Sequence, residues 1–119
     1  MKKTIYEGMS FAVTASSSKK DTFISTNKTA KSGRPLSIKS IRLVHDGNSD
    51  DITINSVFNK TTGEQLVKDV QGMLCYIPAL GVSNLPFEVN SKLGEIECEF
   101  LNGSGSTVNV YLIFEMVED

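Results

Sequence analysis

Residues 95–117 read EIECEFLNGSGSTVNVYLIFEMV, and this stretch decides the fold class of the chain. Its first seven residues begin with a strict alternation of acidic and apolar side chains. The apolar positions are Ile96, Cys98 and Phe100, and the acidic positions are Glu95, Glu97 and Glu99. Alternation of this kind predicts a β-strand with one buried and one solvent-facing side.

A loop rich in Gly and Asn, residues 102–106, separates this strand from a second, mainly apolar run, residues 107–117. A five-residue loop of this composition is common in β-hairpins. We therefore expect the two runs to pair, with Glu97 opposite Tyr111 and Glu95 opposite Ile113. A slip of one residue would turn the carboxylates toward the core, so the alternation also specifies the register.

Short strand-like segments with turn signals between them continue through the rest of the chain. We expect strands at residues 2–6, 9–14, 22–26, 36–45, 52–58, 66–70, 73–77 and 87–90. Within 36–45 the apolar phase shifts between Ile38 and Ile41, which predicts a β-bulge near residues 39–40. No segment keeps a helical period for three turns. Many short strands at this spacing are typical of an antiparallel sandwich or barrel.

The predicted fold is all-β: a single antiparallel β-sandwich over residues 1–119, jelly-roll-like, with eight to nine strands. Residues 1–8 are expected to form an N-terminal arm or an edge strand. A chain of 119 residues fits one domain, and an apolar share of 39% is enough for a core. Cys75 and Cys98 lie in apolar runs, which favours free buried thiols, with a disulfide as the alternative. The first fifteen residues lack the continuous apolar stretch of a signal peptide, and no run is long enough to span a membrane.

The charge is distributed unevenly along the chain. Residues 1–60 hold ten Lys and Arg against five Asp and Glu, and residues 61–119 hold two against nine, so the halves carry +5 and −7. Such a split is typical of a nucleic-acid surface or of complementary faces in an assembly, but two interleaved halves of one sandwich would also mix these charges on the surface. The loop 27–35 brings Lys28, Lys31 and Arg34 together and is expected at the surface.

The sequence offers little for catalysis. His45 is the single histidine, and we expect it at a strand end on the surface. A nucleophile within hydrogen-bond reach of that imidazole cannot be identified from the sequence. We therefore predict that the chain is not an enzyme and needs no cofactor.

One turn has the spacing of a calcium loop. Asp46, Asn48 and Asp50 present oxygen ligands at alternate positions. A helical calcium loop needs Gly at its sixth position and Glu at its twelfth, where this chain has Asp51 and Val57. The turn is therefore only a weak calcium candidate, and no metal site is predicted, because Asp, Gly, Asn and Ser are also ordinary turn residues.

The acidic row Glu95, Glu97 and Glu99 has three interpretations: a catalytic carboxylate pair, a solvated face that prevents aggregation, or part of a contact surface. The expected hairpin sets Tyr111 and Ile113 on the same face, and a mixed apolar and polar face favours contact. The predicted interface residues are Lys28, Lys31, Arg34, Glu95, Glu97, Glu99, Tyr111 and Ile113. Nucleic acid is not an expected partner, because the basic residues lack interleaved aromatic residues and the isoelectric point is about 5.4.

Residues 87–116, FEVNSKLGEIECEFLNGSGSTVNVYLIFEM, resemble the closing strands of small jelly-roll or β-sandwich accessory proteins of bacteriophage virions. The resemblance is carried by an alternating strand, a loop of Asn, Gly and Ser, and a long final strand within Ile96–Met116. It implies a capsid-decorating, cement or other accessory virion protein, and it implies no catalytic residues.

We therefore expect a structural or assembly protein that acts through protein–protein contacts. The expected partners are further copies of the chain, with a trimer favoured, and a larger assembly such as a capsid formed in the host cytoplasm. No membrane partner is expected. The alternative is a carbohydrate- or receptor-binding module that holds its ligand with loops and an exposed tyrosine, Tyr76 or Tyr111.

Overall fold

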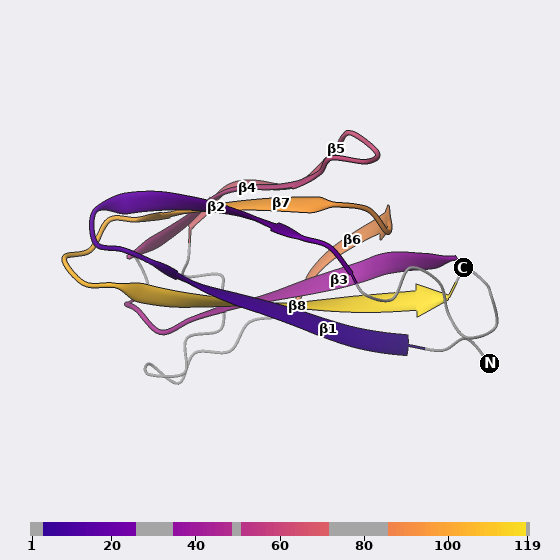
Figure 1. Ribbon diagram of the computed structural model, residues 1–119, viewed down its shortest axis with the longest axis horizontal. Coiled ribbons are helices and arrows are strands. Elements are labelled where there is room, and N and C mark those ends of the chain that lie inside the picture. The colour runs from indigo at the N-terminus through magenta and orange to yellow at the C-terminus, as the bar shows by residue number, and fades with distance from the viewer. Residues whose placement is uncertain (1–3, 26–34, 49–50, 72–85, 119) are drawn as a thin grey trace.

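The structure is a computed structural model, and it describes residues 4–25, 35–48, 51–71 and 86–118. These residues form eight strands in two four-stranded sheets and contain no helix (Figure 1). The first sheet, the β8 sheet, has the order β1 (Thr4–Val13), β8 (Val108–Glu118), β3 (Leu36–His45) and β6 (Phe87–Lys92). The second sheet, the β7 sheet, has the order β2 (Ser17–Phe23), β7 (Ile96–Asn102), β4 (Ile52–Asn59) and β5 (Glu64–Gln71).

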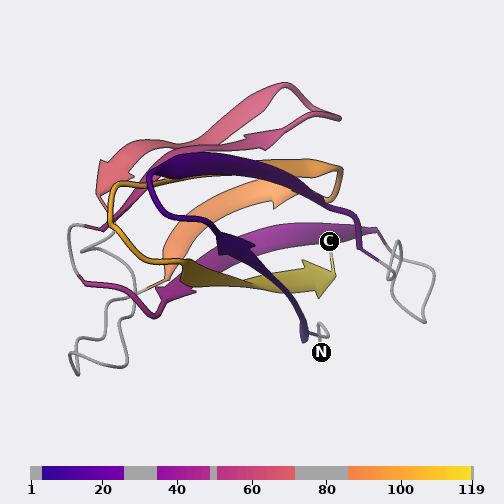
Figure 2. The ribbon, with the colours of Figure 1, turned by 60° about the vertical axis from the view of Figure 1, so that its left-hand side comes forward.

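The strands pair in a nested order. β1 pairs with β8, β2 with β7, β3 with β6 and β4 with β5, and every one of these pairs is antiparallel. Two further pairs, β3 with β8 and β4 with β7, complete the sheets. Figure 2 shows the two sheets as layers that face one another. The predicted antiparallel β-sandwich is confirmed.

The predicted terminal hairpin is wrong as a pairing, because β7 and β8 belong to different sheets. The alternation itself is correct: Ile96, Cys98 and Phe100 on β7 are buried, and so are Val108, Val110 and Leu112 on β8. These residues face each other across the core instead of lying side by side. Alternation determines which side of a strand is buried. It does not determine the partner strand, because a five-residue loop can connect strands of two facing sheets as well as neighbouring strands of one sheet.

Two aromatic pairs join the sheets inside the core. Phe23 of β2 stacks on Phe114 of β8 with ring centroids 3.9 Å apart and planes inclined by 13°. Phe11 of β1 meets Phe100 of β7 at 5.5 Å in a tilted arrangement. All four rings are buried, so each pair excludes water between the layers.

Two bulges set the phase of the inward side chains. The register of β3 shifts between Ile38 and Ser40, which confirms the predicted bulge. A second shift in β4, between Ile54 and Ser56, was not predicted, and it turns Val57 inward where simple alternation would have placed Phe58.

The expected strand at 22–26 is replaced by an earlier one, β2, because the polar residues 17–21 lie on an edge strand whose outer side needs no apolar residues. The strand expected at 73–77 lies outside the described residues. Residues 4–8, expected as an arm or edge strand, form part of β1 at one edge of the β8 sheet.

Two fully buried asparagines hold the ends of the sandwich together. Asn59 donates from Nδ2 to the Lys92 carbonyl at 2.8 Å, and its Oδ1 accepts from the backbone N–H of Thr61 at 3.0 Å. It therefore links the β4–β5 turn to β6 of the other sheet. A Cβ at Gly94 would lie 2.6 Å from Asn59 Oδ1, so this close approach requires glycine. Asn102 plays the equivalent part at the β7–β8 loop.

Candidate functional site

The outer side of the β8 sheet carries three of the large apolar side chains that the fold leaves exposed. Tyr6 is 65% exposed, Tyr111 is 42% exposed and Ile113 is 39% exposed. Strand register sets half-buried Val44 beside Tyr111 on this same side. We call Tyr6, Val44, Tyr111 and Ile113 the apolar face.

Small residues of β1 lie beside this apolar face. Register places Ser10 next to Tyr111 and Gly8 next to Ile113, and Ala12 continues the same row. All three are exposed. Because their side chains are short or absent, the face is low along residues 8–12 of β1 and high along Tyr111 and Ile113 of β8.

A polar group borders the apolar face. Glu115 accepts a hydrogen bond from Ser40 Oγ at 2.8 Å through one carboxylate oxygen and from the Tyr6 hydroxyl at 3.4 Å through the other. Ser40 is buried and lies opposite Glu115 on the neighbouring strand, so its hydroxyl fixes the position of the carboxylate. These residues line a shallow depression of about 500 Å³ together with Arg42, Pro86 and Ile113.

The outer side of the β7 sheet is different, because charges of both signs alternate across it. Register aligns Lys20, Glu99, Ser56 and Lys68 in one row over the four strands. Glu97 forms ion pairs with Lys20 at 3.6 Å and with Lys60 at 3.9 Å. Exposed pairs of this kind contribute at most about 1 kcal/mol each, so the row is a solvated surface with its charges balanced locally.

The predicted mixed patch of carboxylates with Tyr111 and Ile113 is therefore wrong. Glu97 and Glu99 point outward from the β7 sheet, and Tyr111 and Ile113 point outward from the β8 sheet, on opposite sides of the sandwich. Glu95 precedes β7, and its backbone N–H donates to Thr61 Oγ1 at 3.0 Å. Of the predicted interface residues that the structure describes, only Tyr111 and Ile113 lie together on the apolar face.

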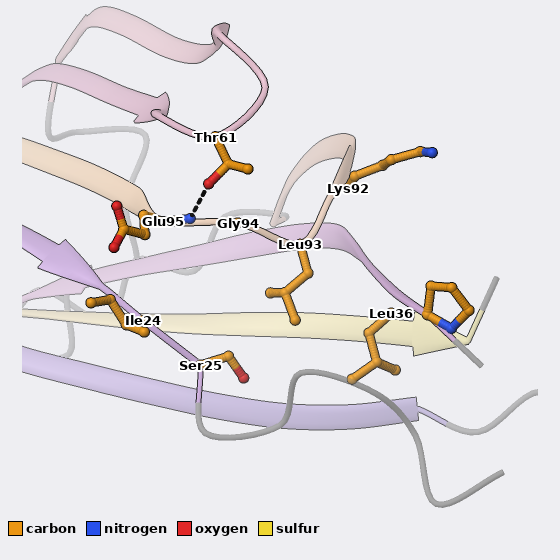
Figure 3. A pocket seen from close by; sticks show the side chains of 9 residues that line it. Ile24, Ser25, Leu36, Thr61, Lys92, Leu93, Gly94 and Glu95 are labelled. Carbon is orange, nitrogen blue, oxygen red and sulfur yellow. Dashed lines mark hydrogen bonds between the residues drawn. The ribbon is translucent and has the colours of Figure 1, made fainter. Parts of the chain in front are cut away.

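A second concavity, of about 410 Å³, lies at one end of the sandwich. Figure 3 shows Ile24, Leu36 and Leu93 around it, with the Glu95 carboxylate at its margin. The β4–β5 turn borders it through Thr61, which accepts the hydrogen bond from Glu95 N–H. Its lining mixes these apolar side chains with the polar residues Ser25, Thr61, Lys92 and Glu95.

Four of the other predicted site residues lie outside the described residues: Lys28, Lys31, Arg34 and Asp50. Asp46 accepts from the backbone N–H of Asn109 at 2.7 Å and from its side-chain amide at 2.8 Å, so its carboxylate links the turn after β3 to β8. Among the described residues, no three His, Cys, Asp or Glu side chains gather as a metal site would need.

His45 is buried, not exposed as predicted. It continues the inward phase of Ile41 and Leu43 to the end of β3. Its Nδ1 accepts a hydrogen bond from the backbone N–H of Gly47 at 3.1 Å. The ring therefore helps to form the turn that follows the strand.

Cys98 is a free thiol in the core, as predicted, whereas Cys75 lies outside the described residues. Burial raises the pKa of Cys98 to about 12, and the negative charges of Asp21 and Glu97 add to this effect. Thiol reagents attack the thiolate. We expect Cys98 to resist such reagents at about pH 8 in the folded protein and to react on unfolding, with mass spectrometry assigning the label.

The same pKa shift makes stability depend on pH. Below the ordinary thiol pKa of 9.0 both states keep the proton and nothing changes. Above it the unfolded chain releases the proton first, so stability is lost as the pH rises from 9.0 toward about 12, by about 1.4 kcal/mol per pH unit. Urea titrations should show this loss as the difference between the parent chain and Cys98→Ala, and parallel pH profiles of the two would contradict it.

Five residues of this outer side were not predicted from the sequence as site residues: Tyr6, Ser40, Arg42, Val44 and Glu115. Part of the signal was present, because Tyr6 has the opposite phase to Phe11 and Val13, which indicates the outer side of the strand. The pairing of Tyr6 with Glu115 joins residues 109 positions apart, and no local pattern specifies such a pair.

The structure defines an all-β sandwich with one apolar and one charged outer face. No family model matches this chain, and no curated protein or solved structure is significantly similar to it. Among the described residues there is no helix long and apolar enough to cross a membrane.

Proposed function

We propose that this chain is a non-enzymatic structural protein that joins a larger protein assembly through its apolar face, as an accessory virion component of the capsid-decoration, cement or head–tail type. The observation that carries the proposal is the contrast between the two outer faces. An antiparallel sheet that faces water on one side is normally polar there, as the β7 sheet is. Exposed apolar side chains gathered on one face mark an interaction site.

Two properties of the apolar face favour protein contact: its residue types, and its position on paired strands. Tyrosine is enriched in interfaces because its ring buries a large area while its hydroxyl keeps a polar partner, as Tyr6 does with Glu115. All four residues of the face lie on paired strands of one sheet. A rigid surface loses little conformational entropy when it binds.

The nested strand order supports the jelly-roll part of the fold prediction. A jelly roll has eight strands in two sheets and occurs among viral capsid domains and lectins. Here the first strand pairs with the last and each later strand with the next one inward, as such a fold requires. This likeness of architecture is compatible with a virion role but does not select it over lectin-like binding.

The partners proposed are further copies of the chain and a capsid, with assembly in the host cytoplasm. The sequence-based docking elements, the basic loop with Lys28, Lys31 and Arg34 and the acidic row, stay predictions. Reversing Glu95, Glu97 and Glu99 to Lys tests the acidic row. Because Glu97 already has two lysine neighbours in its own chain, the ion pairs argue for a smaller effect than an unpaired row would give.

Virions purified from the virus that encodes the chain test the virion proposal directly. Quantitative mass spectrometry should find the chain at tens or hundreds of copies for each particle. A particle preparation washed at high salt should keep it, because apolar contacts are not screened by ions. Absence of the chain from washed particles, or a cellular gene with no associated virus, would overturn the proposal.

The alternative, a carbohydrate-binding module, is favoured by the depression at Tyr6. An exposed ring beside Arg42 and Glu115 could stack on a sugar ring and bind its hydroxyl groups. Binding on a glycan array that is lost in Tyr6→Ala and kept in Tyr111→Ala would establish this function. An array without any bound glycan would leave the assembly proposal as the better explanation of the face.

A further inference from the structure

We infer that the apolar face binds the same face of a second copy about a two-fold axis, so that the chain is a homodimer in solution. This inference rests on the proposed function, because it names the first partner of the surface proposed there. Two features of the described residues, the shape and the charge of the face, support a second copy over an unrelated partner, and the area of the contact sets how tight the dimer can be.

The shape of the face is self-complementary. Tyr111 and Ile113 project along β8, and the row Gly8, Ser10 and Ala12 on β1 is low beside them. Turning a second copy by 180° about an axis that lies in the interface, parallel to the strands and midway between the two rows, places its high row over the low row of the first. In such an isologous contact, β8 of each copy packs on β1 of the other, so the same complementary shapes occur twice in the interface.

The charges of the face are balanced, so two copies do not repel. Arg42 and Lys92 lie on this side of the sheet, and so do Glu88 and Glu115. Two identical surfaces with a single sign of charge would repel, whereas two surfaces with both signs can pair crosswise. The central positions, Tyr111 and Ile113, carry no charge, as the buried centre of an interface requires.

The area fits a weak dimer. β1 and β3 have ten residues each and β8 has eleven. At about 3.3 Å per residue and about 4.8 Å between strands, the four-stranded face covers roughly 600 Å². Complete overlap of two such faces would bury roughly 1,200 Å², the lower end for specific complexes. The contact that sets β8 over β1 covers only two of the four strands, so it buries roughly 700 Å² in total and predicts a weak dimer. Because a face that contacts itself is closed by one two-fold axis, the expected number of copies is two instead of the three that the sequence favoured.

Sedimentation equilibrium of the full chain, from low micromolar to millimolar concentration and at low and high salt, tests the inference. We expect a monomer–dimer equilibrium that high salt does not weaken. Ile113→Lys should raise the dimer dissociation constant by at least about 30-fold, because it places a charge at the centre of the interface.

Leu101→Lys is the matched control. Leu101 is 40% exposed on the inner strand β7, as Ile113 is 39% exposed on the inner strand β8, but Leu101 faces outward from the other sheet. It should leave the dissociation constant within about 3-fold of the parent value. Equal effects of the two lysines would overturn the inference.

Ala12→Arg is a second variant that keeps the test valid if Ile113→Lys does not fold. It fills the low row from an exposed position on an edge strand, so the core is untouched, and it too should weaken the dimer. A parent chain that stays monomeric at every concentration, or that forms a trimer, would overturn the inference. The chain's presence in washed virions would still support the proposed function, and a dimer absent from virions would overturn only that function.

Discussion

Replacing Phe114 with Ala should lower the free energy of unfolding by about 4 kcal/mol. Phe114 is fully buried on β8, and its ring stacks on Phe23 of β2 at 3.9 Å, so it spans the gap between the sheets. Removing it deletes apolar contacts and leaves a cavity that two hydrogen-bonded sheets cannot close. A domain of this size is stable by only about 5–15 kcal/mol, so the loss is a large fraction of the total.

Urea unfolding followed by far-UV circular dichroism measures this loss. Ile113→Ala is the control one residue away, because Ile113 faces outward, and at low protein concentration it should cost less than about 1 kcal/mol. Phe114→Leu should recover part of the stability by refilling the cavity. Equal losses at 113 and 114 would mean that the layers do not pack through Phe114.

This pair of variants also tests what the sequence could specify. The phase of residues 108–116 correctly separated the buried positions from Tyr111 and Ile113, because burial on one side of a strand leaves a period of two in the sequence. Whether β7 lies beside β8 or across from it leaves no such trace. In both arrangements Ile96, Cys98 and Phe100 face apolar partners, so the sequence pattern is the same for both.

The apolar face shows the same limit. Tyr111 and Ile113 were identified from their phase, but their neighbours Gly8, Ser10 and Val44 come from strands distant in sequence. The sequence placed Glu95 and Glu97 beside them instead, and so predicted a mixed patch where the structure has an apolar one. The face could not have been predicted without the strand order.

Irregular positions were predicted only where apolar residues marked them. The bulge in β3 was found because Ile38 and Ile41 are out of phase. The bulge in β4 was missed because Val57 and Phe58 after it are both apolar, and the next inward position, Asn59, is polar, so the sequence does not show which phase continues. His45 was misplaced for the same reason, since a polar side chain on an inward position looks like a surface residue in the sequence. A hydrophobicity pattern cannot identify a polar residue that is buried with all its hydrogen bonds satisfied.

Asn102→Ala should lower the free energy of unfolding by about 3 kcal/mol, the largest effect expected from a polar residue here. Asn102 is fully buried, and its Nδ2 donates to the carbonyls of Val13 at 2.9 Å and Ser106 at 2.8 Å. Its Oδ1 accepts from the backbone N–H of Ser104 at 2.9 Å. One side chain thus holds the β7–β8 loop closed and ties it to β1 of the other sheet, and the alanine leaves these groups without that partner.

Asn109→Ala is the control for Asn102→Ala, because Asn109 also uses its amide but is only half-buried and bonds the exposed Asp46, and it should cost less than about 1 kcal/mol. Asn102→Asp keeps the shape and replaces the donor with a carboxylate that faces two carbonyl oxygens. Its pKa should therefore rise above the unfolded value, so that the variant is most stable in acid and loses stability as the pH rises through that pKa. An Asp variant as stable as the parent at neutral pH would show that the loop does not depend on the Asn102 donor, and that its Gly and Ser residues close the crossing between the sheets by themselves.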